Sequence, residues 1–292
     1  MSGSLVRPIR PRPGKWAGVA LLTVLLTAGA GCSRVDMAYT LAEWTLLKRL
    51  DHYFNLTPAQ ESFLEGRIQL LLDWHQREEL PLLVKRAAEF KARYAHGLGK
   101  EDLLWFQETH KGFWRRFFLR GSGDFAAFLT TLNPEQVAHF RGQMEERNQS
   151  WIEQVEMTAA AQREDTLAWL TEYLEDWLGG LDEGQLTRIQ GWLADDPEWP
   201  RLVLDNRRIF QKAMGDLAAS ARAEGFRGER LQLWIERPDS LWTPAFKSRW
   251  PQKKEEWYTL VLNVDRITTP EQRDHALQKL DGFLAMISPA KA

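Results

Sequence analysis

The strongest candidate for chemistry in this sequence is the pair His75 and Glu79, which lie four residues apart in a predicted helix. Both polar groups continue an apolar stripe on one face of that helix, formed by Leu64, Ile68 and Leu71. The imidazole could move a proton while the carboxylate orients it, or the two groups could supply two metal ligands. In the structural alternative, the pair forms a hydrogen bond along the helix and meets Arg67 or another cation across the core.

Four other residues could complete a site around this pair. Asp51 is a second carboxylate one short predicted turn away, and Tyr53, Arg67 and Trp74 are weak candidates for ligand binding. The spacing provides no third metal ligand and no nucleophile, and the sequence contains neither HExxH nor a phosphate-binding loop. We therefore expect no metal and no cofactor, and the sequence leans away from an enzyme.

Two aromatic segments admit both a binding and a structural interpretation. Residues 113–120 could contact a membrane, an anionic polymer or a protein, although helical spacing favours core aromatics with arginines near a helix end. A second set recurs at helical spacing towards the end of the chain: Trp242, Phe246, Trp250, Trp257 and Tyr258. Such a ladder could stack on carbohydrate if it were exposed, whereas large aromatics at this spacing are usually core.

The first 33 residues combine the features of an export signal. Four basic residues precede an apolar run of 13 residues, Trp16 to Ala28, which is shorter than the ~20 residues that span a membrane. Small residues then lead into Cys32, the only cysteine, and this arrangement resembles the lipobox of bacterial lipoproteins. We expect residues 1–31 to be a signal peptide and Cys32 to carry diacylglycerol and a further acyl chain such as palmitate. Secretion with a free thiol is the alternative.

Ser33 follows the predicted lipidation site. In lipoproteins of Gram-negative bacteria, a residue other than Asp at this position implies the outer membrane, facing the periplasm, with inner-membrane retention as the alternative. Removing residues 1–31 with their four basic residues changes the net charge from −2 to −6 over 261 residues. We therefore expect the membrane as a partner through the lipid anchor and an envelope protein as a further partner, but no nucleic acid.

Residues 32–292 are predicted to form a single all-helical domain facing the periplasm, because apolar residues recur at three- and four-residue spacing without strand-like alternation. We expect an irregular bundle of roughly nine helices. Pro81 should end or kink the helix that starts at residue 58, and residues 121–123 should break the helix that starts at residue 100. The longest predicted helix, 134–177, would span about 65 Å and must therefore bend or break, near residues 158–165.

Four helix starts share a capping pattern, in segments that begin at Leu56, Leu132, Leu181 and Thr268. In each segment Thr, Asn or Asp can cap the first amides, and a Gln three positions later can reach back to the cap. The segments are 76, 49 and 87 residues apart, which is too unequal for a solenoid of fixed repeats.

A dense motif covers about 50 residues from the cysteine onward. It consists of Cys32, Tyr39, Trp44, Leu50, Asp51, Tyr53, Gln60, Arg67, Trp74, His75, Glu79, Leu80 and Pro81. This pattern resembles an uncharacterised family of all-helical lipoproteins of Gram-negative bacteria, and the resemblance implies location and fold but no activity. The Leu-Thr-x-x-Gln form of residues 56–60 is also similar to the motif of small periplasmic chaperones and stress sensors, which are much shorter.

These features predict a lipid-anchored envelope protein that acts as a binding, scaffold or chaperone-like protein. The alternative is an envelope enzyme that acts on cell wall or lipid, with His75 and Glu79 at its site. A structural lipoprotein that links the outer membrane to the wall is the third interpretation. None of them accounts for the 14 tryptophans.

Overall fold

The computed structural model describes residues 34–223, 226 and 228–288, which form helices and turns but no strand. The predicted all-helical class is therefore confirmed. The predicted signal peptide and its lipidation site, Cys32, lie outside the described residues. Within the part that is described, no helix is both long enough and apolar enough to cross a membrane.

The first five helices of the described chain are α2 (Arg34–Phe54), α3 (Pro58–Trp74), α4 (Leu80–Tyr94), α5 (Lys100–Leu129) and α6 (Pro134–Glu146). Helices α2 and α3 pack together as a hairpin across a short turn. At the turn end of this hairpin, Phe54 stacks on Phe140 with 4.8 Å between ring centroids and meets Phe128 edge-on at 5.1 Å. This aromatic core joins α2, α5 and α6.

Helices α3 and α4 are two parts of one helix, separated by a π turn at His75–Glu79. The amide of Leu80 donates to the carbonyl of His75, five residues earlier. Pro81 follows directly, and it has no N–H to donate to the preceding turn. The wider turn accommodates the missing bond, so the helix does not end at Pro81 as one form of the prediction had it, and a π turn precedes the proline instead.

Helix α5 continues through residues 121–123, so the break predicted there is wrong. The reason is packing, because a Cβ on Gly121 would lie only 3.3 Å from the side chain of Leu71. The glycine therefore lets α3 approach α5 closely instead of ending the helix. Asp124, which would cap a new helix after such a break, forms an ion pair with Arg67 instead.

The segment 134–177, predicted as one long helix, consists of α6, α7 (Gln149–Glu156) and α8 (Ala159–Leu178). The predicted interruption near residues 158–165 is confirmed at Thr158, whose hydroxyl caps the start of α8. A further break, which the sequence analysis missed, occurs at Asn148. This residue is completely buried, and its amide donates to Gln211 on α10 at 2.8 Å.

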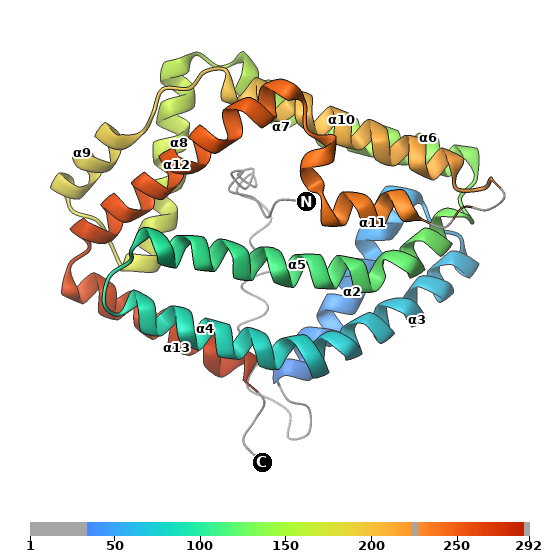
Figure 1. The fold of residues 1–292 in the computed structure, drawn as a ribbon, viewed down its shortest axis with the longest axis horizontal. Helices are drawn as coiled ribbons and strands as arrows, with labels where there is room; N and C mark the ends of the chain where they lie inside the picture. The colour runs from blue at the N-terminus through green and yellow to red at the C-terminus, as the bar shows by residue number, and fades with distance from the viewer. Residues whose placement is uncertain (1–33, 224–225, 227, 289–292) are drawn as a thin grey trace.

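The remaining elements are α9 (Glu183–Trp192), α10 (Trp199–Ser220), α11 (Glu229–Glu236), a 3-10 turn (Pro238–Leu241), α12 (Pro244–Ile267) and α13 (Pro270–Ile287). One hydrophobic core lies among α8, α9, α12 and α13, and another joins α7 and α10 to the start of α12. Figure 1 shows that α13 then runs alongside α4. The last helix thereby packs against the first half of the chain.

All four predicted capping patterns are confirmed as capping boxes at the starts of α3, α6, α9 and α13. The structure shows in addition that their glutamines meet in pairs. Gln60 and Gln136 exchange side-chain amide hydrogen bonds of 3.1 and 2.7 Å. Gln185 and Gln272 do the same at 2.8 and 2.9 Å. Each glutamine pair joins two helix starts that are far apart in the sequence.

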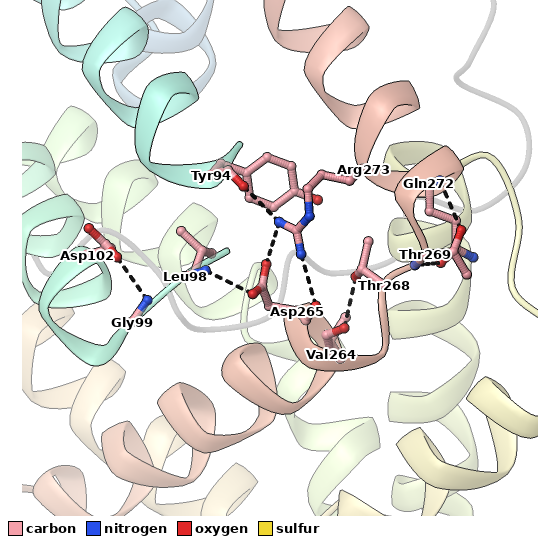
Figure 2. Close-up of polar contacts among 10 residues, drawn as sticks. All are labelled: Tyr94, Leu98, Gly99, Asp102, Val264, Asp265, Thr268, Thr269, Gln272 and Arg273. Carbon is pink, nitrogen blue, oxygen red and sulfur yellow. Dashed lines mark hydrogen bonds and ion pairs between the residues drawn. The ribbon is translucent and has the colours of Figure 1, made fainter. Parts of the chain in front are cut away.

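A polar joint ties the end of α4 to the turn between α12 and α13 (Figure 2). Asp265 accepts from the amide of Leu98 and from the guanidinium of Arg273, both at 2.9 Å. Arg273 also donates to the backbone carbonyl of Tyr94 at 2.7 Å. Because the side chains of Asp265 and Arg273 are only 8% and 17% exposed, this ion pair is largely shielded from water.

Candidate functional site

His75 lies at the start of the π turn and faces α2. The hydroxyl of Tyr39 on α2 is 2.7 Å from its Nδ1, and the ring of Phe117 on α5 meets it edge-on. Burial lowers the pKa of His75, against the opposing charge of Glu79, and burial raises the pKa of Tyr39 to about 12. The Tyr39 hydroxyl can therefore stay protonated and donate to a neutral imidazole.

Glu79 has a different partner. Its carboxylate is 4% exposed and accepts two hydrogen bonds from Arg116 on α5, at 2.6 and 2.8 Å. This bidentate geometry is the strong form of an arginine–carboxylate pair. The structural alternative is met in part: Arg116, in place of Arg67, is the cation that pairs with Glu79, whereas His75 bonds to Tyr39 on α2 rather than along the helix to Glu79.

Of the other four residues predicted near this pair, Trp74 contacts it, with its ring edge-on to that of His75 at 6.5 Å between centroids, whereas the other three have partners elsewhere. Asp51 accepts from the amide of Leu56 at the turn after α2, and Tyr53 accepts from Arg147. Both lie at the turn end of the α2–α3 hairpin, whereas His75 lies at the far end of α3. The twelve residues between Tyr39 and Asp51 on α2 correspond to about 18 Å. The expected network between Asp51, Tyr53 and His75 is therefore wrong.

The remaining two candidates also have separate partners. Arg67 pairs with Asp124 on α5 at 3.6 Å. The guanidinium of Arg120 lies 6.0 Å from the ring of Trp74. Both residues connect α3 to α5, and of the two it is Trp74 that also meets the ring of His75.

The two aromatic segments differ in their burial. In the segment 113–120, Trp114 is 43% exposed, and Phe106, eight residues earlier on the same helix, is 48% exposed, so the core expected there is only partial. The second set behaves as core, because Phe246 is 5% exposed and stacks on Trp199 and on Trp250, at 5.2 and 5.7 Å between ring centroids. This ladder therefore does not form an exposed stacking platform.

A cavity of about 460 Å³ lies elsewhere, between the second and third hydrophobic cores. Its walls come from α7, α8, α9, α10 and α12, and none of its lining residues belongs to α2, α3 or α4. Five of the 14 tryptophans line it, namely Trp151, Trp169, Trp192, Trp199 and Trp257. This volume falls in the range of small-molecule sites in proteins.

A cluster of paired charges forms one wall of this tryptophan cavity. Asp196 and Glu256 both accept from Arg249, at 2.7 and 3.0 Å. Lys253 also lies between the two carboxylates, at 3.3 and 3.1 Å, and its ammonium is 5.6 Å from the ring of Trp199. The side chains of Asp196 and Lys253 are only 9% and 13% exposed, so water screens this cluster weakly.

Trp151 contributes an unpaired donor. Its side chain is nearly fully buried at 4% exposure, and its indole N–H has no hydrogen-bond partner among the described residues. A buried N–H usually finds an acceptor, because leaving it without one costs about 1–3 kcal/mol. The nitrogen itself has almost no accessible surface, so a molecule bound in the cavity does not reach it and the fold bears this cost.

No motif in the sequence indicates this cavity. Its five tryptophans are spread over 107 residues and five helices, so no local spacing connects them. The only signal was the unusual number of tryptophans. Within the described ranges, the structure contains no group of three or more His, Cys, Asp or Glu side chains that could hold a metal ion.

Comparisons with known proteins identify a family. No curated protein and no solved structure matches the chain. The profile of a family of unknown function, DUF6279, matches residues 52–247, which include both the His75–Glu79 segment and most of the walls of the tryptophan cavity. Because this match covers about two thirds of the sequence, the chain belongs to the DUF6279 family.

Proposed function

We propose that this protein is a lipid-anchored protein of the outer membrane that binds a small envelope molecule in the tryptophan cavity. The observation that carries the proposal is the cavity itself, with five indoles and buried paired charges on its walls. Cavities that combine aromatic walls with a few placed polar groups are typical ligand sites. We do not adopt the enzyme alternative, because Glu79 is held by Arg116 and His75 lies outside the cavity.

The cavity should bind a neutral apolar probe of suitable size. We expect saturable binding of N-phenyl-1-naphthylamine, with energy transfer from the cavity tryptophans to the probe. Thr166 lines the cavity, and Thr166→Trp would place an indole inside it. This variant should lower the affinity at least ~10-fold, which corresponds to about 1.4 kcal/mol. Fluorescence titration measures the change.

Thr187→Trp is the matched control. Thr187 is exposed on α9 outside the cavity, and its hydroxyl donates to the carbonyl four residues earlier, as that of Thr166 does. The control should bind the probe like the wild type. Equal probe affinity in both variants, or no binding by the wild type, would contradict a ligand-binding cavity.

The proposed anchor rests on the apolar run, the small residues and the single cysteine at position 32. Cells grown with an alkynyl palmitate analogue should label the wild type, and Cys32→Ser should abolish the labelling. Ser33→Asp should keep the label but move the protein from the outer-membrane to the inner-membrane fraction. Labelling of Cys32→Ser at the wild-type level would refute lipidation at this residue.

A further inference from the structure

We infer that the ligand of the tryptophan cavity is an oligosaccharide of uncharged sugar rings. This inference rests on the proposed binding function and adds the chemical class of the ligand. A pyranose ring presents flat C–H faces and a rim of hydroxyl groups, so it needs apolar surfaces and polar partners in one site. The cavity offers both kinds of surface.

The apolar surfaces are indole rings from five helices. Trp169 on α8 and Trp257 on α12 meet edge-on with 6.3 Å between ring centroids, so their planes face different directions. Trp199 lies on the wall that carries the charged cluster. Indoles are large and rigid and have one polar edge, which suits a ligand that has apolar faces and hydroxyl groups at its rim. Walls of this kind can contact more than one ring.

The charges on the cavity walls are already compensated within the protein. Lys253 lies between Asp196 and Glu256. Arg163 pairs with Asp195 at 2.9 Å, and Glu255 pairs with Lys100 at 2.6 Å. A strongly charged ligand would therefore have to compete with these pairs for its counter-charge. A hydroxyl group can instead bond to the remaining lone pairs of the carboxylates without breaking a pair.

The buried polar groups argue against two other ligand classes. An acyl chain would cover Asp196 and Lys253 with hydrocarbon and leave their remaining hydrogen-bonding capacity unsatisfied. A quaternary ammonium group would gain from the indole faces but has no hydrogen-bonding group to offer the carboxylates and the ammonium of the charged cluster. A sugar hydroxyl can both donate and accept, so it can bond to either kind of group.

The test is calorimetric titration of the purified protein with two neutral trisaccharides, chitotriose and maltotriose. We expect at least one of them to bind, with displacement of N-phenyl-1-naphthylamine from the cavity. Thr166→Trp should abolish trisaccharide binding, whereas Thr187→Trp should not. Choline and palmitate, titrated in the same way, should bind at least ~10-fold more weakly than the better trisaccharide.

Lys253→Met separates the polar contacts from the shape of the cavity. This variant keeps a side chain of similar length but removes the ammonium, while Arg249 still pairs with Asp196 and Glu256, so trisaccharide affinity should fall ~10-fold while affinity for the neutral apolar probe stays within about twofold. Probe binding without trisaccharide binding would overturn the carbohydrate inference and leave the binding function standing. Stronger binding of choline or palmitate would overturn it in the same way, and failure of the probe itself would instead refute the proposed function.

Discussion

Replacing Arg116 with methionine is expected to lower the free energy of unfolding by about 3 kcal/mol. The change leaves the carboxylate of Glu79, which is 4% exposed, without the two hydrogen bonds that now compensate its burial. The expected loss lies at the lower end of the range for broken buried ion pairs, because the Arg116 side chain is 44% exposed. Urea denaturation followed by circular dichroism measures the loss.

The neighbouring residue Arg115 provides the matched control. It pairs with Glu236 at 3.5 Å, and both side chains are about half exposed, so Arg115→Met should cost less than about 1 kcal/mol. The double variant Glu79→Leu with Arg116→Met should recover much of the loss, because neither charge then remains buried alone. Strictly additive losses in the double variant would show that the Glu79–Arg116 pair is not the cause.

Replacing Gln136 with leucine should destabilise the protein by about 3 kcal/mol. Its side-chain amide donates to the carbonyl of Asn55 at 3.0 Å and to Gln60 at 2.7 Å, and its oxygen accepts from the amide of Asn133. Leucine has a similar size but cannot form these hydrogen bonds, so it leaves the partners of Gln136 unpaired in the protein interior, where Gln136 is only 5% exposed. The midpoint of urea denaturation should fall without a change in its slope.

Gln69→Leu on α3 is the control for this change. Gln69 is exposed and donates only to Glu43 at 2.8 Å, so its loss should stay within about 0.5 kcal/mol. Gln272→Leu should behave like Gln136→Leu, because Gln272 forms the same reciprocal amide pair with Gln185. A small effect at Gln136 together with a large one at Gln69 would refute the idea that the glutamine pairs hold the helix starts together.

Local rules predicted the helix starts because a capping box needs only residues within one turn. The Thr57 to Gln60 box and its three counterparts were therefore visible in the sequence. The rules failed at Gly121, where the deciding contact is the side chain of Leu71, 50 residues away. A glycine that ends a helix and a glycine that admits a neighbouring helix look alike until that neighbour is known.

Local sequence patterns could not predict the candidate site for the same reason, because its contacts join residues from different helices. The pair His75 and Glu79 was found because one helix carries both residues, but their partners, Tyr39 and Arg116, come from two other helices. The tryptophan cavity has no single helix that carries two neighbouring indoles at a recognisable spacing. The composition showed an unusual number of tryptophans, but only the packing of five helices revealed the cavity that five of them line.

The π turn at His75–Glu79 also has a geometric consequence for the two halves of the molecule. One additional residue in a helical turn rotates everything after it by about 100° relative to an uninterrupted α-helix. Before the turn, Leu64, Ile68 and Leu72 belong to the first hydrophobic core, and after it Tyr94 packs against the second. Because of this rotation, the continuous helix formed by α3 and α4 directs apolar side chains into the first hydrophobic core before the π turn and towards the second core after it.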